Sequence, residues 1–109
     1  MTDLSAPASR VIVTDLTYSN GTAVAVRVNT GMDGMEVSDE GYGAFIADLM
    51  GFLEDYERAA VGTAVTWGIR FGERSFYTEP VREELLPLAV NCVANASMEA
   101  VLLIARSQP

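Results

Sequence analysis

The chain has no histidine and no lysine, and only one cysteine, among its 109 residues. Without histidine and lysine it lacks the most common general bases, the imidazole ligands of metals and the amine of Schiff-base chemistry. Cys92 has no partner for an internal disulfide and no basic neighbour in the sequence to activate its thiol. The adjacent Glu83 and Glu84 point about 100° apart on a helix, which favours a solvated helix face over a catalytic pair. We therefore predict that the protein is not an enzyme.

Basic residues are also few. Seven arginines stand against fifteen acids, which gives a formal net charge of −8 at pH 7. A surface of this charge repels the phosphate backbone of nucleic acids and attracts basic surfaces. The charge balance therefore predicts no direct binding of nucleic acid, and it leaves open an association with a basic protein.

Long hydrophobic runs and a leader are not apparent. The longest apolar run, AVLLIA at residues 100–105, is far shorter than the roughly 20 residues that cross a bilayer. The first residues lack the basic and apolar regions of a secretory signal. We therefore expect no contact with a membrane, no secretion, and a cytoplasmic or otherwise soluble intracellular protein. Length and composition indicate a flexible N-terminal arm over residues 1–9, followed by a single domain over residues 10–109.

Two β-rich runs on either side of Asn20-Gly21 predict a β-hairpin over residues 10–30. A three-residue loop over residues 19–21, with a bulge at Gly21, is preferred to a two-residue loop. The longer loop pairs Ile12 with Val28 and collects the apolar side chains of both strands on one face. We expect that face to be buried.

The remaining helices and strands are predicted from the spacing of apolar residues along the sequence. Apolar residues at helical spacing predict a helix from about residue 39 to residue 60, with Ser38 as its N-cap. Period-two alternation over residues 63–78 predicts a second hairpin. A second helix is expected from Thr78, divided at Pro87 into two pieces. Residues 98–106 are ambiguous between strand and helix, and their short length favours a strand.

These elements follow one another in the order ββαββαβ. The expected fold is α+β, a small antiparallel-rich sheet of about five strands with two helices packed on one face.

The stretch GMDGMEVSDEGYG, residues 31–43, is the one that most resembles a site. Its acids offer the oxygen ligands that Ca²⁺ prefers, but their spacing is not that of an EF-hand loop. Gly41-Tyr42-Gly43 lacks the third glycine of a dinucleotide-binding loop, and no Gly-Lys pair follows. We therefore expect no metal and no cofactor. The stretch is interpreted as an exposed acidic loop that forms a contact surface through Asp33, Glu36, Asp39 and Glu40.

Small residues recur four apart along the first predicted helix, at Gly43, Ala47 and Gly51. A glycine inside a helix costs roughly 0.5 to 1 kcal/mol relative to alanine, so two of them require a tolerant context or a reason. Such a stripe allows another backbone to approach closely. It packs either on the second helix of the same domain or on a second subunit, and we take it as a candidate interface.

By exclusion, the leading functional hypothesis is a small, acidic, non-catalytic interaction or assembly protein. It would form a homo-oligomer or a subunit of a larger complex. The alternative is an acidic inhibitor or immunity-type protein that covers a basic or nucleic-acid-binding partner. A second alternative is a small-molecule-binding domain or a carboxylate-dependent enzyme, with a pocket between sheet and helices. Acids clustered on one face would favour the inhibitor, whereas scattered acids fit an assembly protein.

Overall fold

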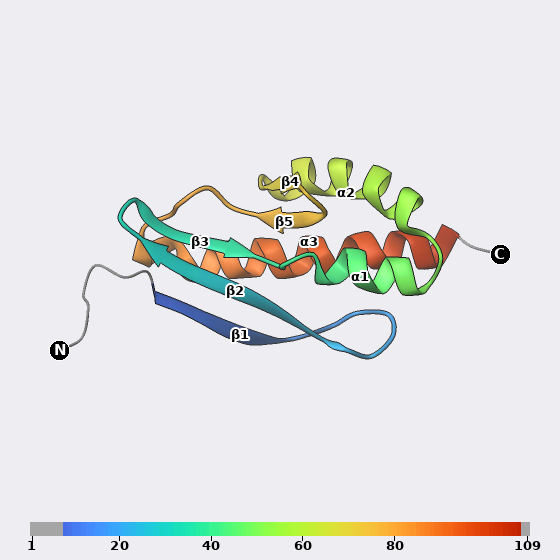
Figure 1. The fold of residues 1–109 in the computed structure, drawn as a ribbon, viewed down its shortest axis with the longest axis horizontal. Helices are drawn as coiled ribbons and strands as arrows, with labels where there is room; N and C mark the ends of the chain where they lie inside the picture. The colour runs from blue at the N-terminus through green and yellow to red at the C-terminus, as the bar shows by residue number, and fades with distance from the viewer. Residues whose placement is uncertain (1–7, 108–109) are drawn as a thin grey trace.

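The computed structural model describes residues 8–107, and residues 1–7 of the predicted arm lie outside this range. The described chain forms an α+β fold (Figure 1). Its elements are β1 (Ala8–Thr17), β2 (Ala23–Gly31), β3 (Gly34–Ser38), α1 (Tyr42–Leu49), α2 (Leu53–Trp67), β4 (Arg70–Gly72), β5 (Ser75–Tyr77), the 3₁₀ helix η1 (Glu83–Leu85) and α3 (Leu86–Ser107).

The strands form one antiparallel sheet of five strands in the order β1-β2-β3-β5-β4. Helix α3 runs along the sheet and contacts four of the strands (Figure 1). Val26 and Val28 of β2 and Val37 of β3 are buried, whereas Asn29 and Glu36, one position away, are exposed. This alternation gives the sheet a covered face toward α3 and an open face toward solvent. The predicted α+β class and five-stranded antiparallel sheet are confirmed, whereas the predicted order ββαββαβ with two helices is wrong.

The turn of the first hairpin has the predicted form. The backbone N–H of Tyr18 donates to the carbonyl of Thr22, and that of Gly21 donates to the carbonyl of Tyr18. Gly21 has φ +87°, a conformation that glycine adopts without a steric penalty. Next to the turn, Thr17 pairs with Ala23, as a loop over residues 19–21 requires.

Farther from the turn the predicted register is wrong. An irregularity between Val13 and Thr17 shifts the pairing, so that Ile12 lies opposite Val26 instead of Val28. The hydroxyl of Thr14 stabilises this bulge, because it donates to the carbonyl of Val24 and accepts a hydrogen bond from the backbone N–H of Leu16. The shift is by an even number of residues, so the same side chains remain on the covered face.

Residues 31–43 do not form the predicted exposed loop. Gly31 pairs with Gly34, so Met32 and Asp33 make a tight turn and the next residues form β3. Gly34 has φ +133°, and a Cβ there would lie 2.6 Å from the carbonyl oxygen of Val81. Glycine is therefore required at this turn by a close approach of the segment before α3. Because glycines and acids surround β3, its short alternation of buried and exposed residues was not recognised in the sequence.

The predicted helix over residues 39–60 is in fact two helices. Gly51, with φ +82°, lies in the break between α1 and α2. Ser38 is not an N-cap, because α1 begins after Gly41, which is left-handed and provides no side-chain cap. Helix α2 then continues to Trp67, through residues predicted as a strand, and ends at the left-handed Gly68. The apolar residues at this end of α2 fit the period of a strand as well as the period of a helix, so the sequence pattern did not distinguish the two.

Helix α3 is continuous where a break and a strand were predicted. Pro87 does not break it, because the helix begins at Leu86 and its first-turn amides need no partner within the helix. Residues 98–106, predicted as a strand, form its second half. The segment is long because buried residues recur along its whole length, from Leu86 to Ile104.

We predict opposite effects of two Gly→Ala substitutions in helices. A Cβ on Gly43 would lie 2.5 Å from Tyr56 Oη and 2.8 Å from Ser97 Oγ, whereas a Cβ on Gly62 has no heavy atom within 4 Å. Gly43→Ala should therefore lower the free energy of unfolding by about 1–3 kcal/mol. Gly62→Ala should raise it by about 0.5–1 kcal/mol. Urea unfolding of both variants measures this, and a stability unchanged by Gly43→Ala would contradict the packing described.

Candidate functional site

Four polar side chains from distant segments meet in the core at the point where β3 leads into α1. They are Asp39, Ser97 of α3, Tyr18 of the first turn and Tyr56 of α2, and all four are almost fully buried. We call them the buried polar cluster. Clusters of this kind are the first place to look for chemistry, because burial changes protonation and strengthens hydrogen bonds.

The carboxylate of Asp39 is surrounded by donors. Its Oδ1 accepts hydrogen bonds from the backbone N–H groups of Gly41 and Phe76, each at 3.0 Å. Its Oδ2 accepts from Ser97 Oγ at 2.6 Å. With the serine proton engaged, Tyr18 Oη donates to Ser97 Oγ at 2.8 Å. Burial raises the pKa of Asp39, and the hydrogen bonds from Ser97 and the backbone oppose that rise.

Tyr56 Oη is the exception in the cluster. Within the described part of the chain it is the buried side-chain polar atom that has no hydrogen-bond partner. Burial raises the pKa of Tyr56 and of Tyr18, so both phenols stay protonated at neutral pH. An unpaired hydroxyl in the core is destabilising, because it loses its hydrogen bonds to water without replacement.

The geometry of the cluster is structural. Asp39 is 1% exposed, and its oxygens already accept hydrogen bonds from the turn before α1, from strand β5 and from helix α3. A substrate would have to displace these donors to reach the carboxylate. The cluster therefore joins the entry of α1, strand β5 and helix α3, and Asp39 does not lie on the contact surface for which it was a candidate.

The other acids of the 31–43 stretch lie apart. Asp33 occupies the tip of the β2–β3 turn, and Glu36 projects from the open face of the sheet. Glu40 forms an ion pair with Arg27 at 2.7 Å. Across residues 8–107 no group of three histidine, cysteine, aspartate or glutamate side chains is placed to hold a metal ion. The structure thus separates four residues that the sequence groups together.

The small-residue stripe is also divided. Gly43 and Ala47 are buried on the inner side of α1, and Gly51 lies exposed in the break that follows. The contact at Gly43 is with Tyr56 and Ser97 of the same domain. This is the intradomain packing left open by the sequence.

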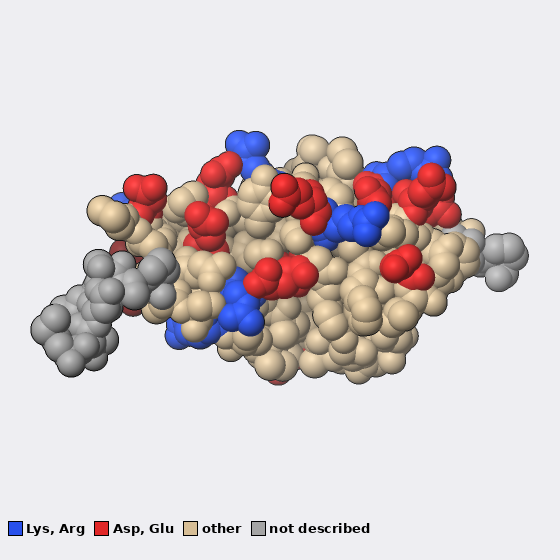
Figure 2. Space-filling view, viewed as in Figure 1, with Lys and Arg blue, Asp and Glu red and all other residues tan. Residues whose placement is uncertain are grey.

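Charged side chains on the surface are interspersed. Figure 2 shows acids and arginines close together over one face of the molecule. Further ion pairs join Arg70 with Glu79 at 2.6 Å and Arg74 with Glu57 at 3.6 Å. The visible acids therefore do not form a single uninterrupted patch.

The N-terminal half of α3 presents a different kind of surface. Residues 85–98 include no acidic or basic residue, and they are the longest such stretch of the chain. Leu88 is 60% exposed on this segment, and Asn91 is exposed beside it. We call this exposed side of residues 85–98 the uncharged α3 face. This face contrasts with the charged surface expected of a protein with a net charge of −8.

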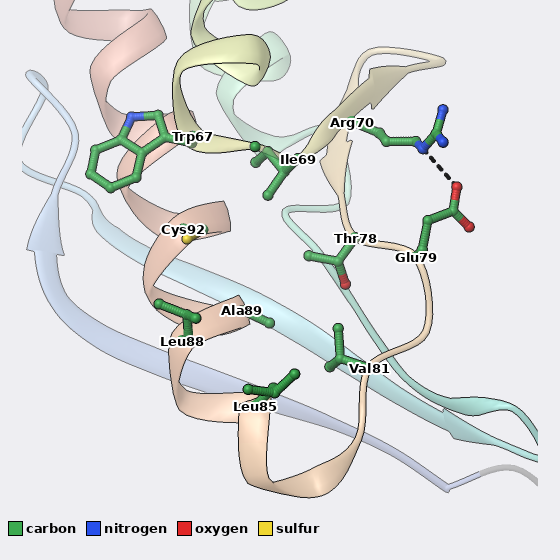
Figure 3. Close-up of a pocket in the computed structure, with 11 residues that line it drawn as sticks. Trp67, Ile69, Arg70, Thr78, Glu79, Val81, Leu85, Leu88, Ala89 and Cys92 are labelled. Carbon is green, nitrogen blue, oxygen red and sulfur yellow. Dashed lines mark ion pairs between the residues drawn. The ribbon is translucent and has the colours of Figure 1, made fainter.

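A groove borders the uncharged α3 face on the side of α2 and β4 (Figure 3). Its volume is about 570 Å³. Trp67 and Ile69 form one wall, and α3 contributes Leu88 and Cys92 to the other, with the Arg70–Glu79 ion pair to one side. We call it the tryptophan groove.

A second groove, of about 670 Å³, borders the same face on the side of β1. Its apolar lining combines Ile12 and Leu16 of β1 with Leu86, Val90 and Ala94 of α3. Arg10 and Asp15 also line it, from opposite halves of the strand. We call it the β1 groove. The two grooves and the ridge between them were not identified from the sequence, although the missing charge over residues 85–98 was a signal for them.

The apolar composition of α3 is shared by core helices and by helices that span a membrane. The helix Glu83–Ser107 is long and apolar enough to cross a membrane by length and composition. An 18-residue window within it has a mean hydropathy of 1.7, and 44% of that window is buried inside the domain. A core helix passes the same test. Here Ser97 and the alanines of α3 pack into the buried polar cluster and the hydrophobic core.

Comparison of the chain with family models, with curated proteins and with solved structures gave no match.

The buried polar cluster predicts unequal effects of removing two tyrosine hydroxyls. Tyr18→Phe leaves Ser97 without its donor and should lower the free energy of unfolding by about 1–2 kcal/mol. Tyr56→Phe removes an unpaired hydroxyl and should leave stability unchanged or slightly higher. Chemical unfolding of the two variants tests this. A larger loss for Tyr56→Phe than for Tyr18→Phe would show that Tyr56 Oη has an essential partner.

Proposed function

We propose that the protein is a non-catalytic assembly protein that associates with copies of itself through the uncharged α3 face. The observation that carries the proposal is the exposed, charge-free segment 85–98 between two apolar grooves, in a chain of net charge −8. Two acidic molecules repel each other, so the least costly contact between them is one that brings no charges together. Apolar burial then provides the attraction.

The chemistry of the described residues supports a binding role. The most buried carboxylate is saturated with donors, and the remaining acids are exposed and partly paired with arginine. The acidic inhibitor or immunity-type role receives less support, because it requires acids clustered on one face. The ion pairs and the interspersed charges of Figure 2 fit an assembly protein better.

The proposal predicts a stable oligomer in solution. Light scattering on a sizing column, at two protein concentrations and two salt concentrations, should give a mass above 11.7 kDa that does not fall at high salt. Salt screens the repulsion between acidic copies and leaves apolar contacts intact. Leu88→Glu should shift the mass toward the monomer, because it introduces charge into the contact.

Val65→Glu is the matched control, since Val65 is 77% exposed on α2 and lines neither groove. A monomeric native protein under all four conditions would contradict the proposed self-association. Dispersal by Val65→Glu and not by Leu88→Glu would move the contact to α2.

The tryptophan groove supports a second candidate function, the binding of a small apolar ligand. It is concave, mainly apolar and lined by one aromatic side chain, as ligand sites commonly are. Trp67 Nε1 donates to Glu99 Oε2 of α3 at 3.0 Å, so the indole is held against α3 at the edge of the groove. The chain has one tryptophan and one cysteine, and both line this groove.

That candidate is tested by the fluorescence of Trp67. Titration with octanoate and with anilinonaphthalene sulfonate should change its emission saturably if the groove binds such ligands. Cys92→Phe, which fills the groove, should abolish the change while the thermal unfolding temperature stays similar. An emission insensitive to both probes in the native protein would exclude the tryptophan groove as a site for ligands of this class.

A further inference from the structure

Helix α3 and the 3₁₀ helix before it carry one line of side chains on the side opposite the buried residues. From residue 84 to residue 98 its members recur three or four residues apart, and the last lies about two turns farther on the same side. All of them are exposed or half-buried. We call this line the α3 stripe, and it consists of Glu84, Leu88, Asn91, Asn95, Met98 and Arg106. Leu88 lines the tryptophan groove and Asn91 lines the β1 groove, so the stripe is the ridge between the two grooves.

The middle of the α3 stripe has the same chemical order from either end. Two amides, Asn91 and Asn95, are flanked by the apolar Leu88 on one side and the apolar Met98 on the other. A surface that joins two identical copies about a two-fold axis must be complementary to itself. When two α3 helices lie antiparallel with the axis between Asn91 and Asn95, Leu88 of each copy meets Met98 of the other. Asn91 of each copy then meets Asn95 of the other, so the stripe fulfils this condition.

The two amides have free groups of opposite kind. Asn95 Nδ2 donates to the backbone carbonyl of Asn91 at 2.8 Å and to Asn91 Oδ1 at 3.0 Å. Among residues 8–107 no group is bonded to Asn91 Nδ2, which is a donor, or to Asn95 Oδ1, which is an acceptor. In the antiparallel pairing, Nδ2 of each Asn91 donates to Oδ1 of Asn95 in the other copy. The amides are then satisfied inside the contact, and their position fixes its register.

The two ends of the α3 stripe carry opposite charges. Glu84 lies in the first turn and Arg106 in the last. Arg106 forms no ion pair in the described part of the chain, and Glu84 forms a long one with Arg82, at 3.5 Å. In the antiparallel pairing, Arg106 of each copy stands about 6 Å along the helix from the level of Glu84 in the other, a gap that the two long side chains can bridge. A parallel pairing would bring like charges together at both ends, so charge selects the antiparallel one.

We infer that self-association joins two copies through the α3 stripe, with the helices antiparallel about a two-fold axis between Asn91 and Asn95. The inference rests on the proposed self-association and gives the geometry of its contact. Glu99, the other charged residue of α3, is held by Trp67 Nε1 beside the stripe. It lies level with Pro87 of the other copy, so the pairing brings no two like charges of α3 together.

A charge exchange tests the pairing. Glu84→Arg places two guanidinium groups at each end of the contact, and Arg106→Glu places two carboxylates there. Each single variant should raise the dissociation constant of the dimer roughly tenfold, because two symmetric attractions become repulsions. The double variant Glu84→Arg with Arg106→Glu should return it to within about threefold of the native value, because the pairs are restored in the opposite sense. Sedimentation equilibrium of all four proteins measures the constants.

Arg58→Glu is the matched control for net charge. Arg58 is exposed on α2 and lines neither groove. Its replacement makes the molecule as negative as Arg106→Glu does, so it measures the general repulsion between copies and should change the dissociation constant less than about twofold. Glu84→Arg makes the molecule less negative. General repulsion alone would therefore tighten that dimer, whereas the α3 pairing predicts that it weakens.

A substitution at the centre of the stripe tests the amide contact without reversing a charge. Asn91→Asp keeps the oxygen that accepts from Asn95 Nδ2, but it replaces the donor that faces the other copy by a carboxylate. It should raise the dissociation constant roughly tenfold, because a charge is buried opposite an acceptor. Asn29→Asp makes the same change at an exposed position of β2 and should leave the constant unchanged. Circular dichroism of each variant verifies the native fold.

The outcomes separate the pairing from self-association itself. A native dimer that the Glu84, Arg106 and Asn91 variants affect no more than their controls would overturn the α3 pairing and leave self-association standing. A folded double variant that dissociates as readily as the single variants would also overturn the antiparallel arrangement. A native monomer at every concentration would overturn both inferences.

Discussion

The carboxylate of Asp39 is the interaction on which the arrangement of the other segments depends. It is the point where the segment between β3 and α1, strand β5 and helix α3 are held together by hydrogen bonds to one buried carboxyl group. A buried polar group is tolerated only when hydrogen bonds within the protein replace its hydration, so each of these segments is fixed relative to the others. Ser97 Oγ also accepts a hydrogen bond from Tyr18 Oη, so the same cluster holds the first turn, which lies far from Asp39 in sequence.

This constraint also explains why small residues occur where they do. Gly43 leaves room for two hydroxyl groups, and the alanines along α3 allow the helix to lie close to α2 and the sheet. A spacing that resembles a helix-to-helix contact between subunits is thus required by the interior of one domain. A stripe between subunits and a stripe inside one domain differ in the surface that the small residues pack against, and the sequence does not reveal that surface.

The α+β class, the antiparallel sheet and the first turn were predictable because each depends on local patterns. The turn at residues 19–21 follows from glycine and from matched apolar strands. The division of α1 from α2 was not predictable, because the apolar period continues across Gly51. Helix α3 was misjudged because Pro87 has opposite meanings inside a helix and in its first turn. Asp39 looked like part of an exposed acidic group, and only its donors from Phe76 and Ser97 explain its burial.

The bulge in β1 has a consequence for how this chain tolerates changes in length. It already accommodates two surplus residues, held by Thr14, without turning any side chain from one face of the sheet to the other. Deleting two residues there would leave Ile12 and Leu16 facing α3, whereas deleting or inserting one would turn the outer half of the strand inside out. Evolutionary insertions and deletions in this strand should therefore be tolerated in pairs.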